Sequence, residues 1–171
     1  MGNTTLTSEF NFHGDPEAAH IVLDTFEADK LDLVPWEFCV DHQLGWEFFD
    51  ELAAGDTKAS ALLQRICGPY QRACRLEPDP AASEEVTPTT LESFVPCDAY
   101  AVLAAIHPET AVTESVKVHA TVELGGNCAR GMLAIDWYRR HNDRLNVNLL
   151  RKLDFEMFKR YFRKAFVRTS A

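Results

Sequence analysis

The chain has 171 residues, of which 46% are hydrophobic, 25% charged and 11% aromatic. This composition is typical of a folded globular protein and excludes a collagen-like, low-complexity or wholly disordered chain. Acidic residues outnumber basic ones, 26 against 17, and the formal net charge of −9 disfavours nucleic acid as a polymeric partner because its phosphates would be repelled.

The sequence contains no apolar run of the roughly 20 residues that cross a bilayer, so no membrane partner is expected. Residues 1–9 are polar and do not resemble a secretory signal. The five cysteines form no C-x-x-C pair, which is typical of reduced thiols in an intracellular protein. We therefore predict a cytoplasmic protein.

The first third of the chain is predicted to begin with a polar loop over residues 1–11, which have almost no periodicity. Asp15-Pro16-Glu17 has the pattern of a helix start with Asp15 as the N-cap, and it predicts a helix over residues 16–27. The apolar residues at 31–34 predict a short buried strand that Pro35 ends.

The middle of the chain is predicted to be helical. A first helix ends at Gly55 and carries apolar residues at helical spacing, namely Leu44, Phe48, Phe49 and Leu52. A second helix over residues 58–76 is interrupted at Gly68-Pro69, and its predicted inner face consists of Ala61, Leu62, Ile66 and Tyr70. Residues 77–90 contain three of the eight prolines and predict a loop.

The last part of the chain alternates between helices and strands. An apolar helix is predicted over residues 97–106. Strict alternation then predicts a half-buried strand over residues 116–124, with inward residues Val116, Val118, Ala120, Val122 and Leu124. A turn at 125–127 and a partner strand at 132–137 complete a β-hairpin near 116–137. A short strand at 147–149 and a closing helix, whose basic residues form its solvated face, end an α/β chain.

Two polar clusters are candidate sites. Asn3, Glu9, Asn11 and Asp15 share one loop before a helix, and such a loop could hold a polyhydroxy ligand because each hydroxyl needs a donor and an acceptor. The alternative, favoured by composition alone, is that Asp15 is only an N-cap and the others are turn residues. Asp98 begins a helix, where an acid is usually a cap or dipole partner.

The sequence gives little support for a catalytic cysteine or for a zinc site. Cys97 lies beside Asp98, but no histidine is placed by the sequence to activate it as a nucleophile. The six histidines have none of the spacings of zinc ligands.

Taken in order, five segments resemble the inosine/uridine-preferring nucleoside hydrolase family. They are Gly-Asn at 2–3, Ser-Glu-Phe-Asn-Phe at 8–12, Asp-Pro-Glu-Ala-Ala at 15–19, Pro-Cys-Asp-Ala-Tyr-Ala-Val at 96–102 and Ala-Arg-Gly-Met at 129–132. The E-F-N-x-x-x-D-P-E-A-A core is specific, and the later segments follow in the family's order.

The resemblance implies hydrolysis of the N-glycosidic bond of a ribonucleoside, giving ribose and a free purine or pyrimidine base. It implies a calcium ion that binds ribose hydroxyls and the attacking water, and an oxocarbenium-like transition state. Asn3, Glu9 and Asn11 match the ribose-binding residues, and Asp98 matches a calcium ligand. The implied fold is an open, mostly parallel sheet flanked by helices, and the full-length form is expected to be a homo-oligomer.

The sequence departs from the family at Cys97, where many members have a histidine that protonates the leaving base. A thiol is a poor general acid for a nitrogen leaving group near pH 7, so the base preference does not transfer to this chain.

The second departure is the absence of the family's D-x-D-x-G-x-D-D segment, which supplies most of the calcium carboxylates. Family members are also roughly twice this length. We therefore expect residues 1–171 to be the C-terminal half of a hydrolase domain, inactive or nearly so alone because Asp98 by itself cannot supply about 6–8 oxygen ligands. Alternatives are a non-catalytic interaction partner of a full-length subunit and a Cys97-dependent enzyme.

Overall fold

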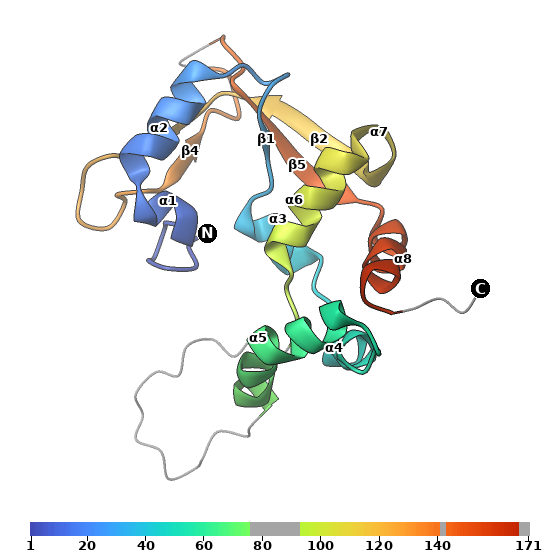
Figure 1. The fold of residues 1–171 in the computed structure, drawn as a ribbon. Coiled ribbons are helices and arrows are strands. Elements are labelled where there is room, and N and C mark those ends of the chain that lie inside the picture. The colour runs from blue at the N-terminus through green and yellow to red at the C-terminus, as the bar shows by residue number, and fades with distance from the viewer. Residues whose placement is uncertain (76–92, 141–142, 168–171) are drawn as a thin grey trace. The chain divides into compact units, whose positions relative to one another are not determined.

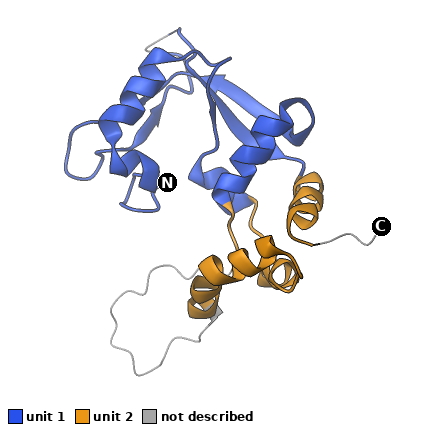
Figure 2. Cartoon of the chain, viewed as in Figure 1, with its two compact units in different colours: residues 1–41, 97–154 blue, residues 42–96, 155–171 orange. Residues whose placement is uncertain are grey.

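The computed structural model describes residues 1–75, 93–140 and 143–167, so the loop predicted at 77–90 lies outside the described residues. The chain divides into two compact units (Figure 2). Unit 1 consists of Met1–Asp41 and Cys97–Asp154, and unit 2 consists of His42–Pro96 and Phe155–Ala171. Within the described ranges, no helix is long and apolar enough to cross a membrane.

Unit 1 combines helices with two small sheets (Figure 1). Its elements are α1 (Phe10–Gly14), α2 (Pro16–Thr25), β1 (Asp32–Leu33), α3 (Trp36–Asp41), α6 (Cys97–Ile106), α7 (Pro108–Ala111), β2 (Val112–Val118), β3 (Ala120–Val122), β4 (Leu133–Ile135) and β5 (Val147–Leu153). The larger sheet has the order β1-β5-β2, and β3 pairs with β4. The short strand predicted at 147–149 is therefore the start of the central strand β5.

The α/β class is confirmed, but the expected mostly parallel sheet is not. Within the described residues, β1 pairs parallel with β5, whereas β2 with β5 and β3 with β4 are antiparallel. The parallel strand is short because Pro35, which has no N–H to donate, follows soon after Leu33. After β2 the chain passes through the hairpin and returns in the opposite direction as β5, so β2 and β5 pair antiparallel.

The predicted hairpin is present, with two differences in detail. Its connection is residues 123–132, so the expected turn at 125–127 is only part of a longer loop. The predicted single strand is interrupted at His119, between the end of β2 and the start of β3. Leu124, predicted to face inward, lies beyond β3 and is 37% exposed.

The interruption at His119 is bridged by Asn146, whose side chain is 1% exposed. Its Oδ1 accepts from the Ala120 N–H at 2.8 Å, and its Nδ2 donates to the carbonyls of Ala120 at 2.8 Å and Leu23 at 2.7 Å. One side chain thereby satisfies the backbone of β3 and ties the last turn of α2 to the sheet.

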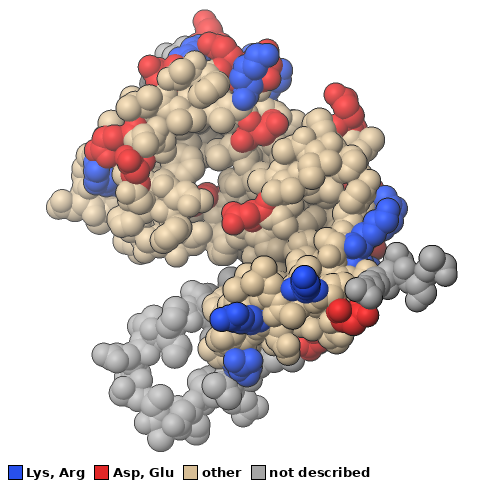
Figure 3. Space-filling model, viewed as in Figure 1, with Lys and Arg blue, Asp and Glu red and all other residues tan. Residues whose placement is uncertain are grey.

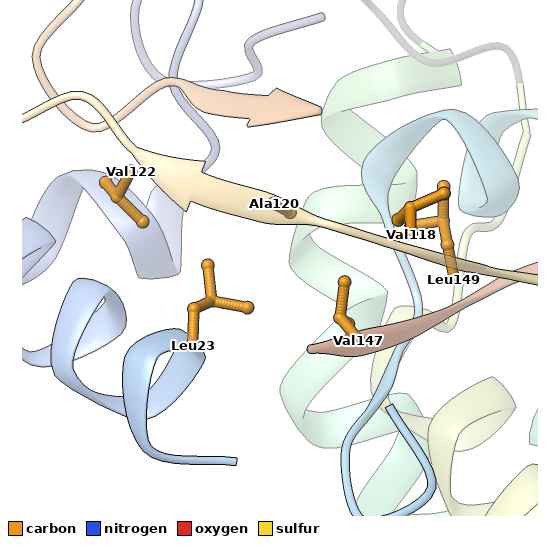
Figure 4. Packing of buried hydrophobic residues seen from close by; sticks show 6 residues of the cluster. All are labelled: Leu23, Val118, Ala120, Val122, Val147 and Leu149. Carbon is orange, nitrogen blue, oxygen red and sulfur yellow. The ribbon is translucent and has the colours of Figure 1, made fainter. Parts of the chain in front are cut away.

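The core of unit 1 lies between α2 and the strands (Figure 4). Its buried members are Leu23, Val118, Ala120, Val122, Val147 and Leu149. The predicted inward alternation is confirmed for the three residues on β2 and β3, and Val116 is partly buried against the same cluster. α2 begins as predicted, because Asp15 Oδ1 accepts from the Ala18 N–H at 2.9 Å, and it ends at Thr25.

Three short helices of unit 1 were not predicted, namely α1, α3 and α7. The cap of α1 comes from outside its own segment, because the Phe10 N–H donates to Asn3 Oδ1 at 2.7 Å. The first N–H of α3, on Trp36, donates to Glu9 Oε1 at 2.9 Å. A local sequence window cannot contain a cap that lies 27 residues away.

Unit 2 is helical and is built on aromatic contacts between α4 (Trp46–Ala53), α5 (Lys58–Arg75) and α8 (Phe155–Phe166). Phe94 packs against Phe49 at 5.2 Å and Phe162 at 6.3 Å between ring centroids. Leu44, Phe48, Phe49 and Leu52 are buried as predicted, although Leu44 lies in a bridge with Phe94 outside the helix. On α8, Arg163 donates to Glu51 and Lys159 to Glu156, as expected for a solvated face.

The predicted inner face of α5 is wrong. α5 continues through Gly68-Pro69, and Leu62, Ile66 and Tyr70 are 57%, 63% and 51% exposed. The buried residues include Ser60, Leu63 and Gln71. Polar residues occupy this face because they have partners: Ser60 Oγ donates to the Phe166 carbonyl, and Gln71 Nε2 to Asp50 Oδ1, both at 2.6 Å.

Asn146→Ala is expected to destabilise the chain by about 3–5 kcal/mol, because it leaves backbone groups of Ala120 and Leu23 buried without partners. Urea unfolding measures the loss. Asn148→Ala is the matched control, since its side chain makes an exposed hydrogen bond to Asp32. We expect the control to lose less than about 1 kcal/mol. Equal losses for the two variants would contradict the role assigned to Asn146.

Candidate functional site

The N-terminal loop of unit 1 is folded around the carbonyl of Ser8. This oxygen accepts the N–H groups of Asn3, Thr4 and Thr5 at 3.2, 3.2 and 3.3 Å. The Ser8 side chain is fully buried, and its hydroxyl donates to the Gly131 carbonyl at 2.9 Å. The loop is therefore an ordered support for the side chains of Asn3 and Glu9.

Residues 128–131, in the connection between β3 and β4, anchor this loop. Thr7 Oγ1 donates to the Cys128 carbonyl at 2.6 Å. Gly131 has a φ of +83°, and a Cβ there would overlap the Ser8 hydroxyl. Arg130 Nη2 donates to both carboxylate oxygens of Glu17 at 2.8 Å. The Ala-Arg-Gly-Met segment thus holds both the loop and α2 in place.

Glu9 is half-buried, and the N–H of Trp36 donates to its Oε1 at 2.9 Å. Burial raises the pKa of Glu9 above its ordinary value, and this effect exceeds the lowering by the Trp36 N–H and by the amino terminus. Within the described part of the chain its second oxygen has no hydrogen-bond partner. That oxygen is available to accept a hydrogen bond from a ligand.

A cavity of about 490 Å³ in unit 1 is lined by Glu9. Leu133 and Ile135 of β4 and Leu149 of β5 contribute apolar walls, while Glu37 and Asp41 add carboxylates. On the face drawn in Figure 3 this unit is hollowed, with acidic side chains near the rim. The volume and the mixture of apolar walls with a few polar groups are typical of a small-molecule site.

The two predicted amides have different surroundings. Asn3 uses Oδ1 to accept from the Phe10 N–H at 2.7 Å and the Thr4 hydroxyl at 3.2 Å. Its Nδ2 donates to no described residue. Asn11 is exposed on α1, and its side chain has no hydrogen-bond partner among the described residues. Both residues thus retain an amide donor, whereas Asp15 is exposed and its Oδ1 is the cap of α2.

Cys97 and Asp98 form the first turn of α6, where Asp98 is exposed and Cys97 is half-buried. A hydrogen bond with Cys39, on α3, lowers the pKa of Cys97, and the same interaction raises the pKa of Cys39. The carboxylates of Glu9 and Asp98 raise the pKa of both thiols. The fold therefore places carboxylates from distant parts of the sequence near the same two sulfurs.

The described residues do not by themselves fit a calcium ion. In the described ranges, no three side chains of His, Cys, Asp or Glu are grouped closely enough to hold a metal. Calcium takes about 6–8 oxygen ligands. Asp98 therefore stays a predicted calcium ligand, and it would supply only one of the donors that the ion needs.

Sequence reasoning missed Cys39, Ser8 and the backbone N–H of Trp36 as parts of this region. Pro35 is the signal that could have indicated α3, because proline is favoured at the start of a helix as well as at the end of a strand. The Pro35 carbonyl indeed accepts from the Cys39 N–H at 3.2 Å. The Gly131 carbonyl that the Ser8 hydroxyl binds and the Glu9 carboxylate that the Trp36 N–H binds have no local signal, because each lies far along the chain.

Of the residues predicted from the sequence, only Glu9 lines the cavity, whereas Asn3, Asn11 and Asp98 do not. The fold and the site together define an α/β protein with carboxylates at a small-molecule cavity. A model of the family described as "Inosine-uridine preferring nucleoside hydrolase" matches residues 1–160. The chain belongs to this family, whose members are N-ribohydrolases, and the resemblance inferred from the sequence is confirmed.

Several relatives bear this out. An inosine-uridine preferring nucleoside hydrolase from Crithidia fasciculata is 28% identical over 157 residues, covering 92% of this chain and 45% of the relative. A solved inosine-guanosine nucleoside hydrolase is 31% identical with a TM-score of 0.79, covering 99% of this chain and 49% of that one. A purine-preferring ribonucleoside hydrolase from Gardnerella vaginalis, at 20% identity and a TM-score of 0.69, covers 91% and 45% and supports the fold. The chain thus spans about half the length of these relatives.

Gly131→Ala is expected to cost about 2–5 kcal/mol, from the positive φ and from displacement of Ser8 by the new methyl group. Gly126→Ala is the matched control, because Gly126 has a φ of +79° but nothing within 4 Å of its Cβ position. The control should cost about 1–2 kcal/mol. Urea unfolding compares the two. A Gly131 variant no worse than the Gly126 variant would show that the contact with Ser8 carries no strain.

Glu9→Gln is expected to stabilise the chain at neutral pH. Burial raises the pKa of Glu9, so its contribution to stability is full below the pKa of the unfolded chain and is lost as pH rises through the folded-state pKa. The glutamine variant retains an acceptor for Trp36 and does not titrate. Its advantage over the wild type in melting temperature should therefore grow between about pH 4 and pH 7.

Glu17→Gln serves as the control with the opposite sign. The hydrogen bond from Arg130 lowers the pKa of Glu17, so the stability that Glu17 contributes is present above its unfolded-chain pKa and is lost as pH falls. Melting curves of the two variants should change in opposite directions relative to wild type. Parallel pH profiles would contradict these assignments.

Proposed function

We propose that this chain supplies the ribose-binding part of a nucleoside N-ribohydrolase, with Asn3, Glu9 and Asn11 as the residues that bind ribose hydroxyls. The observation that carries the proposal is the state of Glu9. Its carboxylate is fixed on one oxygen by the Trp36 N–H, borders a cavity and keeps the other oxygen without a partner in the described part of the chain. A carboxylate held in this way is prepared to accept a hydrogen bond from a sugar hydroxyl.

The two asparagines complement this acceptor. A hydroxyl that donates to Glu9 still needs a donor for its own oxygen, and the Nδ2 groups of Asn3 and Asn11 are donors without described partners. Asn3 is oriented because its Oδ1 is already used by the Phe10 N–H. The proposed arrangement therefore distinguishes ribose from an apolar group of similar size by hydrogen bonds.

Glu9 also suits the charge that develops on ribose during cleavage. Breaking an N-glycosidic bond creates an oxocarbenium-like sugar, and an ionised carboxylate next to it lowers the energy of that transition state. Because burial raises its pKa, Glu9 is protonated at low pH and loses this effect there. Activity of a complete enzyme containing this site would fall on the acid side through Glu9.

Cys97 is proposed to lie at the leaving-group position. A thiol donates a proton poorly to a departing nitrogen near pH 7, so we propose that Cys97 is not the general acid. The names of the relatives include both purine and pyrimidine nucleosides. We accordingly propose ribonucleosides with either class of base as the substrate class.

We propose that Asp98 contributes one oxygen to the calcium ion expected from the resemblance. Calcium would supply a positive charge for ribose hydroxyls and for the attacking water. Since the described residues do not group enough ligands for it, we propose that the 171-residue chain alone turns over nucleosides slowly or not at all.

Ligand-observed NMR with inosine and 2′-deoxyinosine tests ribose recognition by the 171-residue chain. We expect saturable binding of inosine that weakens about 5- to 10-fold when the 2′-hydroxyl is removed, as for the loss of one hydrogen bond. Asn11→Ala should weaken inosine binding by a similar factor, because its side chain has no structural partner in the described chain. Asn127→Ala, an exposed asparagine in the 123–132 loop, is the matched control. Equal affinity for both nucleosides would reject the ribose-binding role.

Turnover is tested separately by measuring the release of base from inosine and uridine. The purified chain should show little activity with added calcium. Turnover comparable to that of a full-length relative, abolished by Asp98→Ala, would contradict the proposal that the isolated chain is inactive.

A further inference from the structure

One wall of the cavity in unit 1 is formed by β4 and the residues that follow it. Leu133 and Ile135 lie two residues apart on β4 and share one face of the strand, and Trp137 follows soon after the strand ends. All three side chains line the cavity. This wall begins next to Gly131, which anchors the loop of Glu9, and four residues of extended chain span roughly 13 Å. The cavity thus contains a carboxylate near the start of the wall and an indole ring at its end.

The indole ring of Trp137 is 51% exposed, so about half of its surface is left uncovered. Arg151, on β5, lines the same cavity, and its Cζ lies 5.9 Å from the centroid of the Trp137 ring. A guanidinium over an indole is held there by a cation–π interaction. The two side chains therefore place a flat aromatic surface beside a group that donates hydrogen bonds.

Arg151 differs from the arginines that are bound to carboxylates elsewhere in the chain. Arg130 donates to Glu17, and Arg163 donates to Glu51. Within the described ranges the Arg151 guanidinium makes no hydrogen bond. A guanidinium has five N–H donors, so those of Arg151 are available to a ligand in the cavity.

We infer that Trp137 and Arg151 form the base-recognition surface of this site. The nucleobase stacks on the indole ring of Trp137, and the Arg151 guanidinium donates a hydrogen bond to a carbonyl oxygen of the base. This inference rests on the proposed function, because Glu9 is the group that binds the ribose of the same nucleoside.

The donor at Arg151 makes the site selective for bases with an oxygen at one position. Hypoxanthine and guanine have an oxygen at C6 and uracil has one at C4, whereas adenine and cytosine have an amino group at the corresponding atoms. An amino group is itself a donor there, so it leaves the guanidinium without an acceptor. Two of the relatives are named for inosine, uridine and guanosine, and all three of these nucleosides have this oxygen.

Competition between nucleosides, measured by ligand-observed NMR on the full 171-residue chain, tests the role of Arg151. We expect inosine to bind about 10-fold more tightly than adenosine, and uridine to exceed cytidine similarly, as for one hydrogen bond from a charged group. Arg151→Met should weaken inosine binding to the level of adenosine and leave adenosine unchanged. Arg151→Lys retains a donor and should retain part of the preference.

Lys152→Met is the matched control for Arg151→Met. Lys152 is the next residue on β5, is exposed, binds Glu114 at 2.7 Å and does not line the cavity. This variant should keep the affinities of the wild type for both inosine and adenosine.

The role of Trp137 is tested by Trp137→Leu. Loss of stacking should weaken inosine and adenosine by the same factor, about 10-fold, and leave their ratio unchanged. Tyr138→Leu is the control, because Tyr138 is 78% exposed and does not line the cavity. Trp137 and Arg151 are both exposed, so these variants should melt close to the wild-type temperature.

Free hypoxanthine and adenine separate this inference from the ribose-binding role of Glu9, because neither contains a sugar. The wild type should prefer hypoxanthine, and Arg151→Met should abolish the preference. Equal affinity of the wild type for inosine and adenosine, or a preference that survives Arg151→Met, would overturn the inference. A retained preference for hypoxanthine without any effect of the 2′-hydroxyl of inosine would reject only the ribose-binding role. Absence of nucleoside binding would reject both.

Discussion

The fold of unit 1 depends on the hydrogen bonds of one buried amide, that of Asn146. Its side chain replaces the backbone ladder where the strand is interrupted at His119, and it also bonds the last turn of α2. The helix and strands that enclose the apolar core are joined there by directional bonds as well as by packing. Burial of Asn146 is tolerated because its side-chain oxygen and nitrogen both have partners, and loss of either bond leaves backbone groups unsatisfied.

The candidate site is held to the helix and strands of unit 1 by contacts between residues that are far apart in the sequence. α2 carries Glu17, which Arg130 binds, and the neighbouring Gly131 leaves just enough room for Ser8. Ser8 organises the loop that presents Asn3 and Glu9. The positions of the polar groups thus depend on backbone approach at a glycine, which explains physically why a small residue stands in that segment.

The region around α3 and α6 combines two kinds of chemistry. Glu9 and Asp98, the carboxylates proposed for ribose and calcium, both raise the pKa of Cys39 and of Cys97. Cys97 stands where the family resemblance places a proton donor, and its interaction with Cys39 lowers its pKa. The chain spans about half of a relative's length, and its N-terminal loop holds in an ordered arrangement two of the residues proposed to bind ribose.

Local patterns determined much of the secondary structure and the identity of the candidate residues. Asp15 and Pro16 predicted the start of α2, alternation predicted the inward side of Val118 to Val122, and the E-F-N core identified Glu9 and its family. The tertiary structure alone decided the mixed strand directions, the caps of α1 and α3, the inward face of α5 and the packing of Phe38 in α3 against Tyr100 in α6. Hydrophobic periodicity and local caps act within a few residues, whereas these features depend on partners far along the chain, such as Trp36 for Glu9 and Asp50 for Gln71.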